Sequence, residues 1–274
     1  MKITNNYNLP EAIYKLCSKV YRPEEGVFSV TDLVGPPMIR YLKMKHWDEL
    51  VDDASNRLWQ VLGQAIHSAL QKIDIEDGLV EEKISINIDG VKIVGRPDLW
   101  QEEVITDWKC TSVYSFIFGA KKEWEAQLNC YAFLYRSMGF ETKKLRIYAI
   151  LRDWMQSRAT ERDYPSIPFL QAEIPLWDVS EQEDYIRRRI AAHYALTPCT
   201  DEEMWVRPST FAVMKEGSSK AMRVFDTSEE AQKFQRDFAL QYPKIKTQIE
   251  ERKGRNVRCE SYCIVRDFCE NRPR

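Results

Sequence analysis

The sequence predicts an α/β protein with a mixed central sheet flanked by helices. Short runs of alternating apolar and polar residues are bounded by turn residues, and segments with helical periodicity lie before and after them. Between residues 49 and 151 we expect a helix, three strands, a second helix and a further strand. With 274 residues, 44% of them hydrophobic, the chain can bury a substantial core.

The N-terminal part of the chain is predicted to be mainly helical. We expect a short helix over Glu11–Val20, and Phe28–Leu33 has the features of a helix start. A long helix is predicted over Glu49–Leu70, with His67 next to its apolar stripe. The stripe consists of residues at helical spacing: Leu58, Leu62, Ile66 and Leu70.

Three strands are predicted to follow this helix. Glu82–Ile88 alternates between polar and apolar residues and ends at Asp89-Gly90, which is a hairpin signal. A second strand is expected over Val91–Trp100, and Gln101–Glu103 forms the turn into a third strand, Val104–Lys109.

The third strand carries acidic and basic groups in a pattern that suits a hydrolytic metal site. Asp107 and Lys109 are two residues apart and therefore point to the same side, and the hairpin brings Asp98 beside them. Two carboxylates on neighbouring strands suit Mg²⁺ or Mn²⁺, and Lys109 could stabilise developing charge or orient a water molecule. Alternatively, Asp98 belongs to a turn and the other two form an exposed ion pair of little energetic value.

A helix and a strand are predicted after this hairpin. The helix spans Glu123–Met138 and stops at Gly139, a typical C-terminal glycine. Gln127 and Tyr131 are four residues apart and so lie on one face of it. The strand Lys144–Leu151 then has its apolar residues on one face.

Four short motifs in this order resemble the RecB-type nucleases of the PD-(D/E)xK superfamily, a group that includes the nuclease domains of RecB and AddAB, CRISPR-associated nucleases and phage-encoded exonucleases. The motifs are a histidine on a helix (His67), G-x-P-D (Gly95–Asp98), D-x-K (Asp107–Lys109) and Q-x-x-x-Y (Gln127–Tyr131). The resemblance covers Gly63 to Tyr131. It implies a restriction-endonuclease-like core with a mixed central sheet.

The resemblance also implies a role for each motif residue. The metal would be held by four groups: the side chains of His67, Asp98 and Asp107, and the backbone carbonyl of Trp108. Lys109 would be the catalytic amine, and Gln127 and Tyr131 would position DNA or water. From the residues alone, His67 could equally be a hydrogen-bonded histidine at the core edge, and Gln127 and Tyr131 could serve helix packing.

The function implied by the resemblance is metal-dependent DNA cleavage. We expect an exonuclease acting on DNA ends or single strands in recombination, repair or phage DNA processing, with a recombination or replication protein as a possible partner. A catalytically silent DNA-end-binding subunit with the same fold is the alternative, although the complete set of motif residues argues against it. A structural metal-cluster protein with surface acids is a third interpretation.

Charge and hydropathy limit the other possibilities. The net charge of −2 gives no overall basic surface, so DNA binding must depend on local patches and on bound metal. We find no long apolar run and no signal-peptide pattern, and therefore expect a cytoplasmic protein without membrane contact.

The segment after the core is predicted to contain mixed elements. We expect a polar loop over Arg152–Ser166, an edge strand over Ala172–Leu176, and a helix from Ser180 to Leu196 with a capping box. A hairpin is predicted over Ser209–Phe225, followed by a helix that runs to about Tyr242.

Three cysteines within eleven residues mark the C-terminus: Cys259, Cys263 and Cys269. Disulfides are disfavoured in the cytoplasm, so thiolate ligation of zinc or of an iron–sulfur cluster is the physical alternative to unligated thiols. The trio resembles that of cluster-bearing RecB-type nucleases, with one extra residue in the first gap, and on this resemblance we favour a [4Fe–4S] cluster over Zn²⁺. Cys199 is our choice for the fourth ligand, and Cys17 is second. We therefore expect a nuclease core, residues 1–198, and a cysteine-bearing subdomain, residues 199–274, held on it by the metal centre.

Overall fold

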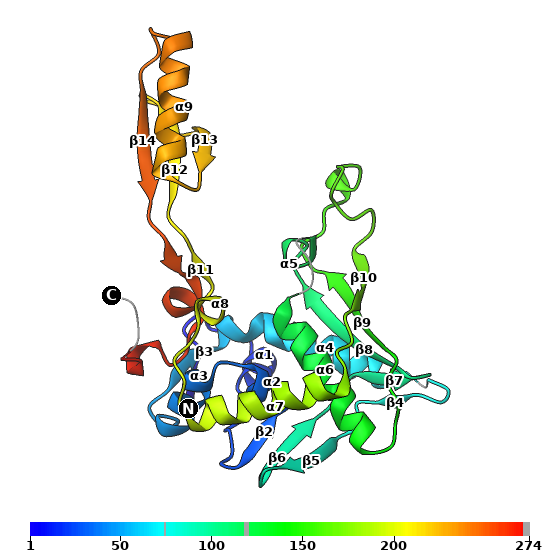
Figure 1. Ribbon diagram of the computed structural model, residues 1–274. Helices are drawn as coiled ribbons and strands as arrows, with labels where there is room; N and C mark the ends of the chain where they lie inside the picture. Colours follow the sequence, from blue (N-terminus) through cyan, green and yellow to red (C-terminus); the bar gives the residue numbers. More distant parts are fainter. Residues whose placement is uncertain (74, 118–120, 271–274) are drawn as a thin grey trace. The chain divides into compact units, whose positions relative to one another are not determined.

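Two mixed sheets and several helices build the first of two structural units. The computed structural model describes residues 1–73, 75–117 and 121–270 (Figure 1). The chain divides into the units Met1–Pro198 and Cys199–Arg274. None of the helices within the described residues is long and apolar enough to cross a membrane.

A five-stranded sheet forms the centre of the first unit. Its strands lie in the order β10 (Phe169–Ile174), β9 (Lys144–Leu151), β8 (Val104–Thr111), β7 (Leu99–Gln101) and β4 (Leu79–Val80). β8 and β9 are parallel, whereas the other neighbours are antiparallel. The predicted mixed α/β architecture is thus confirmed.

The strand expected over Val91–Trp100 is in fact two strands in two different sheets. β6 (Val91–Gly95) lies between β2 (Val27–Ser29) and β5 (Ile84–Ile88), and only β7 pairs with β8. Pro97 separates the two strands, because proline has no N–H to continue a ladder.

The turn between β7 and β8 is confirmed as a tight hairpin. Glu102 and Glu103 have φ of 48° and 63°, the left-handed values that a two-residue hairpin of the right twist requires. The hairpin fixes the register of the two strands, with Leu99 opposite Thr106. This register positions the acidic residues that flank Leu99 and Thr106.

The predicted long helix begins nine residues later than expected. Val51–Asp53 forms strand β3, which pairs in parallel with β1 (Lys2–Thr4), and a 3₁₀ turn, η1 (Ala54–Arg57), precedes α4 (Leu58–Leu70). The Asp53 carboxylate accepts the N–H groups of Ser55 and Asn6, which favours the strand and turn over helix. The predicted stripe of α4 is only partly covered, since Leu58 is 37% and Leu62 is 39% exposed.

Helix α6 (Lys122–Ser137) is the most deeply buried helix segment of the first unit and ends at Gly139, with φ of 89°, as predicted. It contacts β8, β5, α2 (Val30–Val34) and α7 (Val179–Tyr194). Figure 1 shows α6 and α7 alongside each other. The core that α6 organises combines Leu128 and Leu134 of this helix with apolar residues of both sheets, including Ile105, Ile147, Ile93 and Ile84.

Two further boundaries differ from the prediction. α7 begins after Asp178, whose carboxylate accepts the N–H of Glu181, so the expected capping box at Ser180 is wrong. The expected strand Ala172–Leu176 is β10, which ends before Pro175 for the same reason that β6 ends before Pro97. The remaining elements of this unit are α1 (Glu11–Cys17), α3 (Pro37–Lys45), α5 (Tyr114–Ile117) and the 3₁₀ turn η2 (Gln156–Arg158).

The second unit contains the predicted hairpin and helix. β12 (Thr210–Lys215) pairs with β13 (Ala221–Phe225) and with β14 (Thr247–Arg252), and α9 (Ser228–Gln241) packs on all three strands. The other elements are short: α8 (Asp201–Met204), β11 (Val206–Arg207), β15 (Arg255–Asn256), η3 (Arg258–Tyr262) and η4 (Arg266–Phe268).

Candidate metal and catalytic site

The β7–β8 hairpin brings two buried carboxylates together. Asp98 directly precedes β7 and Asp107 follows Thr106 on β8, so the register Leu99–Thr106 puts the two acids opposite each other. Asp98 is 9% exposed and Asp107 is 3% exposed. The N–H of Trp108 donates a 2.6 Å hydrogen bond to Asp98 Oδ2, which fixes this carboxylate against β8.

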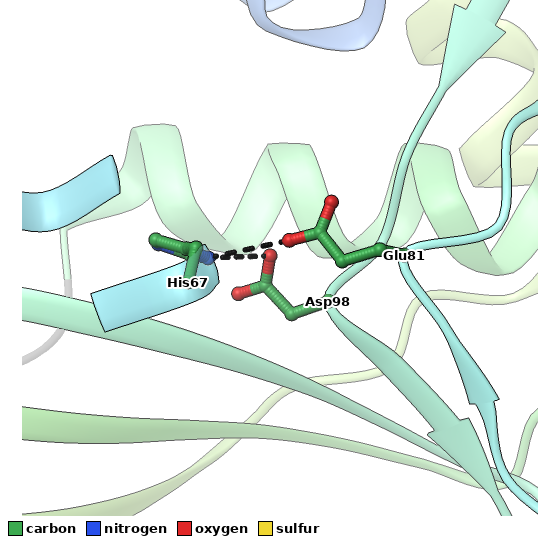
Figure 2. Close-up of side chains that lie close together, drawn as sticks. All are labelled: His67, Glu81 and Asp98. Atoms are coloured by element: carbon green, nitrogen blue, oxygen red, sulfur yellow. Dashed lines mark ion pairs between the residues drawn. The ribbon is translucent and has the colours of Figure 1, made fainter. Parts of the chain in front are cut away.

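His67 reaches the same carboxylate from the last turn of α4. Its Nδ1 lies 3.0 Å from Asp98 Oδ1 and 3.6 Å from Oε1 of Glu81 (Figure 2). The hydrogen bond to Asp98 is the largest of the effects that raise the pKa of His67 above its usual value. A helix residue and a strand-end residue, predicted separately from the sequence, therefore meet.

Glu81 was not predicted as a site residue. It follows the two-residue strand β4 and donates its backbone N–H to the carbonyl oxygen of Asp98, at 3.1 Å. Its φ of 52° turns the chain so that its side chain joins His67 and Asp98. A strand of two residues is too short to show alternation, so the sequence carries no pattern that pairs Glu81 with Asp98.

A chain of polar contacts runs from β8 to α6. Lys109 Nζ lies 2.7 Å from Asp107 Oδ2 and donates a 3.3 Å hydrogen bond to Gln127 Oε1. Gln127 Nε2 in turn donates to the Tyr131 hydroxyl at 3.1 Å. Burial raises the pKa of Tyr131 above its usual value, which keeps its phenol protonated. The predicted D-x-K and Q-x-x-x-Y residues thus form one connected group.

Asp107 is buried and has the Lys109 ammonium as its ion-pair partner. Its Oδ2 lies 2.7 Å from Lys109 Nζ, and within the described residues this oxygen has no other polar partner. Burial is also the largest of the effects that raise the pKa of Asp107, with Lys109 acting against it. A buried carboxylate oxygen of this kind is a natural place for a cation.

The three carboxylates carry more negative charge than their surroundings compensate. Glu81, Asp98 and Asp107 lie near Lys109 and Arg96, so the carboxylates outnumber these cations by one when His67 is neutral. Burial raises the pKa of Glu81, and the charge of Asp98 raises it further. A bound divalent cation would offset this charge and stabilise the ionised forms.

The spacing of the donor atoms also fits a divalent cation. One ligand atom each from His67, Glu81 and Asp98 lies within 4.8 Å of the others. Bonds of about 2.1 Å place opposite ligands of Mg²⁺ about 4.2 Å apart, so small side-chain movements suffice to close a shell around one ion. The carboxylates suit both Mg²⁺ and Mn²⁺, and the imidazole, a softer ligand, favours Mn²⁺ over Mg²⁺. Trp108 lies between Asp107 and Lys109 on β8, and ligation by its carbonyl stays a prediction.

All four predicted cysteine ligands lie in the second unit, whereas Cys17, the second choice, is fully buried in the first. Burial raises the pKa of the Cys199 thiol to about 12, and the other three thiols add to this effect. Burial also raises the pKa of Cys263, and Cys259 and Cys269 again contribute. The four sulfurs are therefore close enough to interact electrostatically: Cys199, Cys259, Cys263 and Cys269.

Comparison with known proteins gives a family match over most of the chain. The family described as the PD-(D/E)XK nuclease superfamily matches residues 39–270. A search of curated proteins found no match. Among solved structures, the crystal structure of SSO0001 is 22% identical, with a TM-score of 0.49, and the similarity covers 71% of this chain and 91% of that one. A phage-related exonuclease from Haemophilus somnus 129PT is 14% identical, with a TM-score of 0.36 and coverage of 64% and 94%.

Proposed function

Because the chain belongs to the PD-(D/E)XK nuclease superfamily, we propose that it is a metal-dependent DNA nuclease that hydrolyses phosphodiester bonds at DNA ends or in single strands. The observation that carries this proposal is the convergence of two buried carboxylates, Asp107 and Asp98, with His67 and Lys109. His67, Asp98 and Asp107 would hold the metal, together with the carbonyl of Trp108 and, in addition, Glu81.

Each group of the candidate site would have a separate role in hydrolysis. A bound Mg²⁺ or Mn²⁺ would supply positive charge to the phosphate and lower the pKa of an attacking water. Lys109 would stabilise the charge that develops on the phosphate oxygens, because an ammonium in a partly dry site acts there without reorganisation. Gln127 holds the Lys109 ammonium by its amide oxygen, and Tyr131 holds Gln127 in place.

Exposed aromatic and basic side chains near the end of β8 support a single-stranded substrate. Trp59 is 60% exposed and lies under the guanidinium of Arg152, which is 4.3 Å from its ring centre. The N–H of Arg152 bonds to the carbonyl of Thr111, the last residue of β8. Bases can stack on such an aromatic ring while the arginine contacts phosphate, which is the usual design of a single-strand surface.

The test is digestion of end-labelled single- and double-stranded DNA with Mn²⁺ or Mg²⁺. Lys109→Ala should lower kcat by about 10²–10³-fold with little change in DNA affinity, as expected for an interaction made mainly in the transition state. The matched control is Lys144→Ala, an exposed lysine on the neighbouring strand β9, which should retain activity. The cleavage pattern reports whether ends are required.

The same assay separates catalysis from silent binding. A wild-type protein that binds DNA ends but cleaves nothing with either metal would contradict the proposed activity and support the catalytically silent subunit. Full activity in the presence of EDTA would contradict the metal requirement. A role in recombination, repair or phage DNA processing, and a recombination or replication protein as partner, are proposed on the motif resemblance.

We propose further that Cys199, Cys259, Cys263 and Cys269 hold one metal centre in the second unit, a [4Fe–4S] cluster or, alternatively, Zn²⁺. The electrostatic coupling of the four thiols supports a shared centre. Burial, the charge of Glu203 and the other three thiols together keep Cys199 protonated, so ligation needs a metal that stabilises the thiolate.

A further inference from the structure

A cavity of about 210 Å³ adjoins the candidate metal site. His67, Glu81 and Asp98 form its polar end. The rest of its wall is mainly apolar and comes from the end of α4, the segment after it, β4, β7 and β8: Leu70, Ile73, Ile75, Val80, Leu99 and Trp108. Any occupant of this cavity would therefore lie directly beside the candidate metal ligands.

The far wall of the cavity is firmly packed. A methyl group placed on Gly78 would lie 2.9 Å from the Ile75 side chain and 3.1 Å from the Leu99 side chain, so a larger residue at this position would have to displace them. Val80 and Leu99 are cross-strand neighbours in the β4–β7 pair. Paired strands and contacting side chains thus form this part of the cavity wall. The wall adjoins the start of β7, which Asp98 directly precedes.

The chemistry of the wall selects the occupant. A phosphate or another anion is disfavoured, because the polar end presents two carboxylates and the remaining wall offers mainly apolar surface. The volume is below the 300 Å³ or so of sites that hold whole drug-sized ligands, so it suits one flat ring system. Gln71 at the lining adds an amide that can pair with the edge of such a ring.

We propose that this cavity binds the nucleobase next to the scissile phosphate, taken out of the base stack. The inference rests on the proposed nuclease function and deepens it, because a base can enter only when it is unpaired. The enzyme would then require a single strand or a frayed end. The cavity would accept any base, because every base is an aromatic ring with an apolar face, and it would not read the sequence.

The experiment compares single-stranded oligonucleotides that carry an abasic tetrahydrofuran residue at the 5′ end, at the 3′ end or at one internal position. In wild type with Mn²⁺, loss of the base beside the cleaved bond should lower kcat/KM by about 5- to 150-fold. Ile73→Trp places a larger side chain at the cavity and should lower kcat/KM on the base-bearing strand to a similar extent. On the strand that is abasic at the cleaved position, Ile73→Trp should change nothing.

A matched control is Ile167→Trp, because Ile167 is 56% exposed, Ile73 is 58% exposed, and Ile167 does not line the cavity. It should discriminate between the two strands as wild type does. Equal loss of activity on both strands in Ile73→Trp, or no effect of the missing base in wild type, would overturn the base-binding role while the nuclease function stands. No cleavage by wild type would refute the nuclease function instead, and the difference in binding affinity between the two strands would then still test the cavity.

Discussion

At the scale of single residues, Glu81 adds a negative charge to the candidate site. Asp98 and Asp107 would share a single divalent cation with His67, and a third carboxylate gives the site one excess negative charge over Lys109 and Arg96 when His67 is neutral. The N–H of Glu81 donates to the backbone carbonyl of Asp98, which fixes the Glu81 backbone beside that residue. We propose that its carboxylate is a further ligand of the metal.

Glu81→Gln should weaken Mn²⁺ binding, since glutamine keeps the shape of the side chain but removes one negative charge. Loss of outer partners of a metal ligand already costs about 10- to 100-fold in affinity, so a carboxylate within reach of the ion should cost no less. Calorimetric titration of Mn²⁺ without DNA measures this effect. The neighbouring Glu82 is exposed, and Glu82→Gln is the control. Equal Mn²⁺ affinities for the two variants would exclude Glu81 from the site.

The sequence predicted the strand residues of the site better than it predicted Glu81, and the reason is physical. Asp107 and Lys109 share a face because strand geometry has a period of two, and the turn at Glu102 fixes Asp98 opposite Asp107. Gln127 and Tyr131 share a helix face by the same kind of local rule. Glu81 depends on the pairing of a two-residue strand and on a left-handed φ, and neither leaves a periodic signal.

At the scale of elements, α7 stabilises the end of α2. The His193 ring Nε2 lies 3.1 Å from the carbonyl oxygen of Leu33, and Arg189 donates to the carbonyl oxygens of Leu33, Val34 and Gly35. These are the carbonyls that a helix leaves without partners at its C-terminus. Contacts between residues about 155 positions apart thus cap a five-residue helix, α2, that would not be stable alone.

Burial, together with the charges of Arg189 and Arg40, lowers the pKa of His193 to about 4, while the bond to Leu33 and the charge of Asp32 act in the opposite direction. The unfolded chain, with an ordinary histidine pKa near 6.5, binds a proton more readily than the folded one. Stability from this group should therefore be constant above about pH 6.5 and fall by up to about 3 kcal/mol between pH 6.5 and 4.

Denaturant unfolding of wild type and His193→Gln at several pH values tests this effect. Glutamine can still donate to Leu33 but does not titrate. Because both proteins have the same carboxylates, their contribution cancels in the difference between the two free energies of unfolding. Wild type should lose more free energy of unfolding than the variant as the pH falls from 7 to 4. Parallel curves would show that His193 is protonated as easily in the folded protein as in the unfolded chain.

The helix and strand boundaries that were predicted wrongly are those where strand pairing between distant segments overrides the local sequence pattern. Val51–Asp53 reads as part of a helix, but it pairs with Lys2–Thr4, nearly fifty residues away, and local periodicity cannot report such pairing. The division of Val91–Trp100 into β6 and β7 was foreseeable at Pro97, whereas the assignment of β6 to a second sheet with β2 was not. The helix α6 and the turn at Glu102 depend on local signals and were predicted correctly.

At the scale of the whole molecule, the two units separate the proposed chemistries. His67, Asp98, Asp107 and Lys109 lie in the first unit, and the four cysteines of the proposed centre lie in the second. Cys199 is the first residue of the second unit, and Cys259 to Cys269 lie near its end. A metal centre shared by these residues would therefore close the second unit on itself, from its start to its end.

Cys199→Ser should remove the metal centre and destabilise the second unit together. Ligation of Cys199 and Cys259 closes a loop of about 60 residues, and the loop-entropy estimate used for disulfides gives about 4 kcal/mol for a cross-link of this length. Cys110→Ser, at a half-buried cysteine of the first unit, is the control and should keep its metal content.

Iron, acid-labile sulfide and zinc in anaerobically purified protein give the nature of the centre, and limited proteolysis reports the stability of the second unit. Iron and sulfide in equal amounts support a [4Fe–4S] cluster, and one zinc without sulfide supports the alternative. Since the acidic site uses other residues, Mn²⁺ binding to the first unit should persist in Cys199→Ser. Wild type without either metal, and with the same protease resistance as Cys199→Ser, would refute the shared centre and leave the nuclease proposal intact.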